Sequence, residues 1–206
     1  MNMTLLETIR TCKVLPVVVT DDVERSVKLA QVLARAGMST IEVTLRTKNA
    51  LACIQAIKEQ VPEMTVAAGT VTNVQELDDA LQAGAEFVLS PGISETLIRA
   101  AKARDVLFIP GVSTASEIML GREHDITLFK VFPAEAIGGV GLLKSLAGPF
   151  PDVQFCPTGG LNPENFREYL ALDCVTCIGG SWMVKADMIE AGQWERIEEL
   201  AREAVR

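Results

Sequence analysis

Residues 40–70 read TIEVTLRTKNALACIQAIKEQVPEMTVAAGT, and this stretch predicts a strand, a helix and a second strand. β-Branched residues are dense at its two ends, 40–45 and 65–70, as is typical of strands. Between them, apolar residues at helical spacing cover positions 50–57 and stop before Pro62. Two parallel strands need a crossover connection, usually a helix, so the stretch predicts a βαβ unit.

The same alternation extends over the whole chain. Six further runs of strand-forming residues lie at 14–19, 87–90, 107–110, 128–132, 154–158 and 175–179. Helical patterns separate the runs, and two of these patterns stop at Gly37 and Gly84, where glycine supplies a left-handed C-cap. Asn162, followed by Pro-Glu, predicts the start of another helix. Residues 1–13 predict a short leading helix.

Eight strands alternating with eight helices, with no linker between them, predict one domain over residues 1–206. The expected fold class is α/β, a single (β/α)8 TIM barrel with a short N-terminal helix. An open doubly wound sheet is the alternative. It is disfavoured because no G-x-G-x-x-G motif follows the first strand.

Composition excludes several classes of protein. No run of 18 or more apolar residues is present, so no membrane span is expected. The leading MNMTLLETIRTCK lacks the continuous apolar segment of a signal peptide, and the cytoplasm is the expected location. The net charge of −8 argues against a nucleic-acid partner, which needs a basic face.

Cysteine and histidine usage argues against a metal site. Cys174 and Cys177 form C-x-x-C within the strand-like CVTCIGG, which favours small buried residues over a redox pair. No second cysteine pair supports zinc. The single histidine, His124, lies in the polar stretch GREHDIT and is expected at the surface. Acid–base chemistry must then use carboxylates, lysines, cysteines or water.

Two charged residues lie inside apolar strands. Side chains of a barrel strand alternate between the helices and the axis, which directs Glu42 and Lys130 inward. An unpaired buried charge costs several kcal/mol, so the two residues form a structural ion pair or take part in chemistry. Their positions near the carboxyl ends of strands favour chemistry. An amine nucleophile must be neutral, and burial favours that form, so Lys130 is the candidate nucleophile.

Groups that could hold an anion lie at the same end of the strands. Arg46 follows Glu42 by four residues and can bind a carboxylate through two parallel hydrogen bonds, although it could also be a surface arginine. Thr70 adds a hydroxyl at the same rim. Glycine pairs occur in PTGG (157–160) and IGGS (178–181), after the seventh and eighth strands. Loops at these places, each followed by a helix N-terminus, form the recurrent phosphate site of barrel enzymes.

These motifs, taken together, resemble one family over nearly the whole chain. The matching segments are EVTLRT (42–47), AAGTV (67–71), SPGIS (90–94), FKVFPAEA (129–136), LAGPFP (146–151), FCPTGG (155–160) and CIGGSW (177–182). They are similar to 2-keto-3-deoxy-6-phosphogluconate (KDPG) aldolase, also known as 4-hydroxy-2-oxoglutarate (KHG) aldolase. The resemblance implies a homotrimeric class I aldolase that splits a phosphorylated 2-keto acid into pyruvate and glyceraldehyde 3-phosphate, with no metal and no cofactor.

The resemblance also implies roles for individual residues. Lys130 would form the Schiff base, and Glu42 would be the general acid/base. The substrate-binding residues it implies are Arg46 and Thr70 for the carboxylate, Pro91 and Phe132 for an apolar wall, Thr158 for hydroxyls, and Gly159, Gly160, Gly180 and Ser181 for the phosphate. Ile137 departs from the family pattern, which expects a small or polar residue there.

Three other functions remain open at this stage. A galactonate-series aldolase shares the mechanism, but the EVTLRT and FPAEA segments favour the gluconate enzyme. A sugar-phosphate isomerase or epimerase would use Glu42 as a base without forming an imine. A non-catalytic barrel would bind phosphorylated metabolites without converting them.

Overall fold

The structure of the protein, a computed structural model, describes residues 3–206. Its strands are β1 (Val14–Val18), β2 (Thr40–Thr44), β3 (Thr65–Gly69), β4 (Phe87–Leu89), β5 (Leu107–Ile109), β6 (Gly111–Val112), β7 (Leu128–Val131), β8 (Gln154–Pro157) and β9 (Ile178–Gly180). Its helices are α1 (Met3–Cys12), α2 (Val23–Arg35), α3 (Ala50–Gln60), α4 (Val74–Gln82), α5 (Glu95–Ala103), α6 (Ala115–Arg122), α7 (Gly139–Ala147), α8 (Phe166–Leu170), α9 (Ala186–Glu190), α10 (Trp194–Val205) and the 3-10 helix η1 (Glu135–Ile137).

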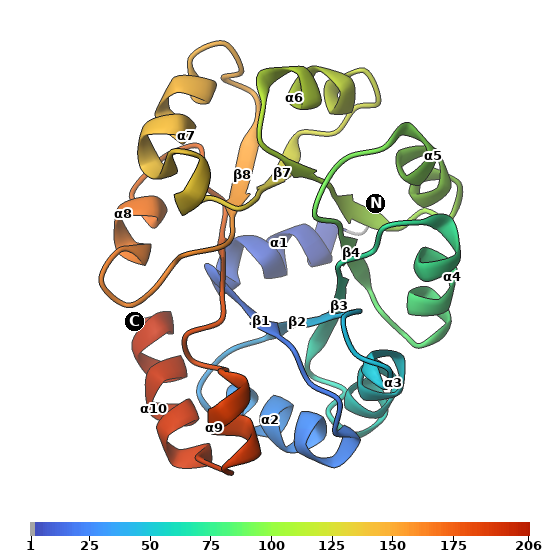
Figure 1. Cartoon of the computed structure of the whole chain (residues 1–206), viewed down its shortest axis with the longest axis vertical. Helices are drawn as coiled ribbons and strands as arrows, with labels where there is room; N and C mark the ends of the chain where they lie inside the picture. Colours follow the sequence, from blue (N-terminus) through green and yellow to red (C-terminus); the bar gives the residue numbers. More distant parts are fainter. Residues whose placement is uncertain (1–2) are drawn as a thin grey trace.

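All strand pairs are parallel, which confirms the predicted α/β class. The strands form a six-stranded sheet, in the order β5-β4-β3-β2-β1-β9, and a three-stranded sheet, β6-β7-β8. A single residue, Pro110, separates β5 from β6. Isolated bridges from Phe155 and Thr158 to Val175 and Gly179 join the far edges of the two sheets. Helices α2 to α10 lie outside the strands, and α1 lies across the middle (Figure 1).

The strands separate two apolar clusters, as period-2 alternation requires. The larger cluster lies between strands and helices and includes Phe129 and Val131, the residues that flank Lys130. The smaller cluster lies on the opposite face and includes Leu128 of β7. Helix α1 contributes Ile9 and Cys12 to this inner cluster, which explains its position across the middle of the strands.

Several predicted boundaries differ from the structure. The last strand begins at Ile178 rather than at residue 175. Helix α8 begins at Phe166 instead of directly after Asn162, because Asn162 Oδ1 accepts the backbone N–H groups of Glu164 and Asn165 at 2.9 and 3.2 Å and stabilises a turn there. Among residues 3–206, ten α-helices and one 3-10 helix are found where eight helices and a short leading helix were expected, and none is long and apolar enough to cross a membrane.

The predicted helix ends at glycine are confirmed. Gly37 follows α2 and Gly84 follows α4 with φ of 95° and 98°. In this left-handed region a side chain would be strained, so glycine terminates both helices at low cost.

Candidate active site

Lys130 and Glu42 meet inside the ring of strands. Lys130 Nζ donates to Glu42 Oε1 at 2.9 Å, although the two residues are 88 positions apart in sequence. The lysine side chain is 7% exposed and the glutamate side chain is not exposed. The inward orientation predicted for both residues is therefore confirmed, and the amine and the carboxylate can exchange a proton directly.

Glu42 keeps one acceptor unused. Its second oxygen, Oε2, is buried and has no hydrogen-bond partner among the residues that the structure describes. Leaving a buried polar atom unpaired costs about 1–3 kcal/mol, so such an atom needs an explanation. The free oxygen fits a group that accepts a proton or a ligand hydroxyl.

Gly69 of β3 makes room for this carboxylate. A Cβ atom on Gly69 would lie 2.8 Å from both Cγ and Cδ of Glu42. Because Ala67 and Glu42 are paired across β3 and β2, Gly69 lies two residues further along the neighbouring strand. Sequence analysis did not single out this residue. A glycine inside a strand often marks a place where another group approaches the backbone closely. This pattern could have identified Gly69 from the sequence.

Arg46 and Thr70 lie at the carboxyl ends of two neighbouring strands, β2 and β3. Thr44 and Gly69, the last residues of these strands, are paired. Arg46 is exposed and forms no ion pair with another described residue, so its guanidinium is available. Thr70 has a φ of 62°, which is unusual for a β-branched residue. Strained backbone of this kind occurs preferentially at functional sites.

Pro91 and Phe132 follow β4 and β7 at the same end of the strands. The Phe132 ring lies 5.6 Å from Lys130 Nζ, and this residue is 37% exposed. The Pro91 backbone packs against Gly111, where a side chain would clash with it. Phe132 is thus the aromatic group beside the lysine. Phe129 and Val131, the sequence neighbours of Lys130, lie on the opposite face of β7.

Glycine is required for different reasons in the two glycine pairs. Gly159 and Gly160 have φ of 100° and 84°, a conformation that favours glycine. A Cβ on Gly179 would lie 2.8 Å from Cγ2 of the buried Thr158, and one on Gly180 would lie 2.6 Å from Cε3 of Trp182. Gly179 and Gly180 therefore accommodate neighbouring side chains, and Thr158 is held between the two loops.

The helix N-termini expected directly after the glycine pairs are absent. Helix α8 begins at Phe166 and α9 at Ala186, and a turn precedes each. The exposed Ser181 starts the second turn, in which its carbonyl accepts the Val184 N–H at 3.1 Å. Any anion bound by these loops must be held by loop backbone and hydroxyl groups instead of by a helix dipole.

His124 lies at the opposite end of the strands, whereas Cys156 is paired with Lys130 across β7 and β8. The His124 side chain is 17% exposed and 3.9 Å from Glu95 Oε1, so it is more buried than the surface position expected. Cys177 is buried in the inner cluster, as predicted, while Cys174 is half-buried. Burial raises the pKa of the neighbouring Cys12 to about 11, so that thiol stays protonated. No described residues form a His, Cys, Asp and Glu group suited to a metal ion.

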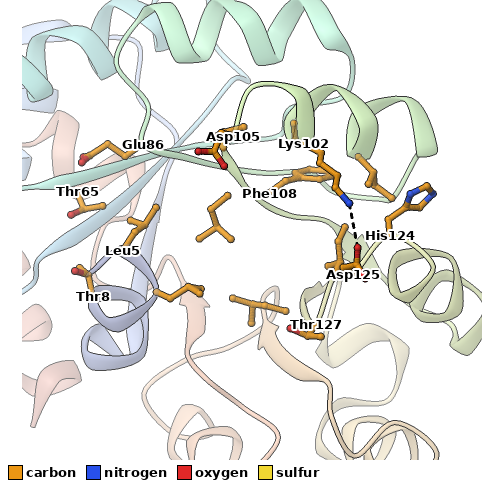
Figure 2. A pocket seen from close by; sticks show the side chains of 17 residues that line it. Leu5, Thr8, Thr65, Glu86, Lys102, Asp105, Phe108, His124, Asp125 and Thr127 are labelled. Carbon is orange, nitrogen blue, oxygen red and sulfur yellow. Dashed lines mark hydrogen bonds and ion pairs between the residues drawn. The ribbon is translucent and has the colours of Figure 1, made fainter. Parts of the chain in front are cut away.

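A cavity lies at the opposite end of the strands. It has a volume of about 590 Å³ and is shown in Figure 2. Thr65, Leu107 and Leu128, which begin β3, β5 and β7, line it, so it opens at the amino ends of the strands. An ion pair between Lys102 and Asp125, 3.2 Å apart, lies at its edge. None of the predicted site residues lines it, so this cavity is separate from the candidate active site.

Known proteins similar to this chain form a consistent set. The family described as KDPG and KHG aldolase matches residues 5–200. The KHG/KDPG aldolase of Escherichia coli K12 is 53% identical over 192 residues, which is 93% of this chain and 90% of the relative.

Two solved structures are also similar. A KDPG aldolase from Legionella pneumophila, with pyruvate captured at low pH as a covalent carbinolamine intermediate, has a TM-score of 0.94 at 39% identity, covering 97% of each chain. The aldolase of Zymomonas mobilis ZM4 with 3-phosphoglycerate has a TM-score of 0.90 at 42% identity, covering 96% of this chain and 93% of its own.

Proposed function

The chain belongs to the KDPG and KHG aldolase family, and on that premise we propose that it cleaves KDPG to pyruvate and glyceraldehyde 3-phosphate through a Schiff base on Lys130. The observation that carries the assignment is the buried contact of 2.9 Å between Lys130 Nζ and Glu42 Oε1. The pyruvate carbinolamine captured in the Legionella relative supports covalent chemistry.

The reaction begins at the lysine. Glu42 accepts a proton from Lys130, and the neutral amine attacks the C2 carbonyl of the substrate to form a carbinolamine. Glu42 returns this proton to the departing hydroxyl, so that loss of water gives a protonated imine and Glu42 is again a carboxylate. Because the iminium nitrogen can accept an electron pair, the C3–C4 bond breaks and its electrons form an enamine.

Proton transfer by Glu42 completes the cycle. Glu42, acting through a water molecule, removes the proton of the C4 hydroxyl during cleavage, and glyceraldehyde 3-phosphate leaves as the aldehyde. The carboxyl group then returns a proton to C3 of the enamine. Hydrolysis of the resulting imine releases pyruvate and regenerates Lys130. The unpartnered Glu42 Oε2 supports this role, because it leaves one oxygen free for the transfer.

Binding groups surround the reacting carbons. We assign the substrate carboxylate to Arg46 and Thr70, and the apolar wall beside the imine to Pro91 and Phe132. Contacts with substrate hydroxyls are assigned to Thr158. The phosphate is assigned to the loops that carry Gly159, Gly160, Gly180 and Ser181. The 3-phosphoglycerate bound by the Zymomonas relative supports a site for a phosphorylated ligand. No metal and no organic cofactor enters the proposed reaction.

Cleavage of KHG to pyruvate and glyoxylate is proposed as a second activity. The Escherichia coli relative is named for both substrates. The steps at Lys130 and Glu42 are the same for either substrate, because both carry a hydroxyl two carbons from the keto group. Only the distal end of the substrate differs.

The assembly and setting of the enzyme are also proposals. We infer that the two sheets close into one eight-stranded barrel over residues 1–206. The single residue between β5 and β6, and the bridges from the β8 strand to the β9 segment, support this closure. A homotrimer is proposed from the family resemblance. The cytoplasm is proposed because all five cysteines are unpaired thiols, which suits a reducing compartment.

The direct test is to measure pyruvate release from KDPG and from KHG. The wild-type protein is expected to release pyruvate from both, and Lys130→Ala from neither, with its circular dichroism spectrum retained. Lys102→Ala is the matched control, since Lys102 is an exposed lysine paired with Asp125. An isomerase or a binding protein would release no pyruvate, and either result would reject the proposed function.

A further inference from the structure

Tyr169, the only tyrosine of the chain, has a polar contact that the proposed reaction does not use. It lies on α8 and is 1% exposed, and its hydroxyl donates to Glu135 Oε1 on η1. Burial, together with the neighbouring Glu135, raises the pKa of Tyr169 well above its usual range. The hydroxyl therefore stays protonated and acts as a neutral donor to a carboxylate.

Glu135 covers the glycine loop assigned to the phosphate. A Cβ atom on Gly160 would lie 2.6 Å from Glu135 Cβ and 2.7 Å from its Cγ, so the glutamate packs directly against this glycine. The backbones are also joined. Ala134 N donates to Thr158 O at 2.8 Å, and Glu135 N donates to Gly159 O at 3.1 Å. Residues 134–135 and 158–160 consequently form one structural unit.

The position of the Glu135 carboxylate matters because it lies close to the loop assigned to the phosphate. Glu135 is exposed, and as a carboxylate next to a phosphate loop it would repel a phosphate dianion if it could turn toward it. Its Oε1 is instead held by Tyr169 from the side of α8. A Cβ on Gly139 would lie 3.0 Å from the Tyr169 hydroxyl oxygen and 3.3 Å from Glu135 Oε1, so a third segment closes around this hydrogen bond.

We propose that Tyr169 is a positioning residue that holds Glu135 against Gly160 and thereby favours phosphorylated over unphosphorylated substrates. The inference rests on the proposed function, because it takes the Gly159–Gly160 loop as the phosphate site. Tyr169 and Glu135 do not touch the reacting carbons in this scheme. Their effect is on the distal end of the substrate alone.

Tyr169→Phe removes the hydroxyl and keeps the ring. Because hydrogen bonds to charged groups are worth about 1.5–3 kcal/mol, kcat/KM for KDPG is expected to fall at least about 10-fold, mainly through KM. The value for unphosphorylated KHG is expected to stay within about two-fold. A second variant, Tyr169→Phe with Glu135→Gln, removes the unrestrained charge and is expected to recover part of the loss. Leu170→Ala, on the same helix, is the control for general loosening of α8.

A binding measurement separates this inference from the proposed function. Calorimetry with 3-phosphoglycerate and with glycerate needs no aldolase activity. The variant is expected to weaken 3-phosphoglycerate binding about 10-fold and to leave glycerate unaffected. Unchanged affinity for 3-phosphoglycerate would overturn the role of Tyr169. So would an equal loss of affinity for 3-phosphoglycerate and glycerate, or an equal loss of kcat/KM for KDPG and KHG. A wild-type protein that binds 3-phosphoglycerate in a Tyr169-dependent way but releases no pyruvate would reject the aldolase and retain the positioning role.

Discussion

Gly69→Ala adds a single methyl group beside the Glu42 carboxylate. Gly69 has no positive φ, so alanine fits its backbone conformation and only space is at issue. The new Cβ would lie 2.8 Å from both Cγ and Cδ of Glu42. Carbon atoms in good contact are about 3.5–4.0 Å apart, so the carboxylate must move by about 1 Å.

A shift of this size separates the two catalytic groups. The Lys130 Nζ to Glu42 Oε1 distance is now 2.9 Å. Moving the carboxylate about 1 Å away from Gly69 would bring the pair outside the 2.7–3.2 Å range of a good N–H···O bond. Misplacement of a reacting group by about 1 Å can reduce the rate about 100-fold. Overpacking should also lower the free energy of unfolding by about 1–3 kcal/mol.

The assay is pyruvate release at saturating KDPG, with urea unfolding measured in parallel. The expected result is a kcat about 100-fold below that of the wild type in a protein that remains folded at the assay temperature. Gly141→Ala is the matched control, because a Cβ there meets no atom within 4 Å. A folded Gly69→Ala enzyme with kcat within about three-fold of wild type would refute the reasoning that Glu42 must stay in its present place.

Three further predictions concern other groups. Glu42→Gln should still form the pyruvate imine, with water accepting the Lys130 proton in place of Glu42, but slow proton exchange at the pyruvate methyl group about 10²–10⁴-fold, measured by NMR in deuterated water. Arg46→Ala should raise KM about 10–100-fold with little change in unfolding free energy, because the exposed guanidinium contributes charged hydrogen bonds to the substrate carboxylate. Burial raises the pKa of Glu117, but hydrogen bonds from Ser113 and Thr114 outweigh it, and the net pKa is lowered. Its stabilising contribution is therefore present above the unfolded-state pKa, about 4.3, and is lost as the pH falls through the lower folded-state value. Urea unfolding of Glu117→Gln should accordingly show a weaker pH dependence in this acidic range, and an unchanged profile would contradict the assignment.

The strands and their inward residues could be predicted because they depend on local pattern. Period-2 alternation is set by backbone geometry, and charges at Glu42 and Lys130 are conspicuous within apolar runs. The contact between them was predicted only as a consequence of both pointing to one axis. Boundaries were less predictable, since the apolar run at 175–179 has the composition of a strand but pairs as one only from Ile178.

Contacts between distant segments left no signal in local pattern. Tyr169 and Glu135 are 34 residues apart, and nothing in either neighbourhood indicates that they meet. The role of Gly69 likewise depends on a side chain of the adjacent strand. For the glycine pairs, the local pattern was visible in the sequence, but its structural cause was not. Their composition suggested open backbone, whereas Gly179 and Gly180 are required by the packing of Thr158 and Trp182.

Borohydride reduction in the presence of pyruvate, followed by peptide mass mapping, tests the central claim most directly. Reduction converts an imine into a stable secondary amine, so the account predicts a lactyl-type mass addition on Lys130 alone and none in Lys130→Ala. An adduct on another lysine, or no adduct while the wild-type protein still releases pyruvate, would contradict the Schiff base at Lys130.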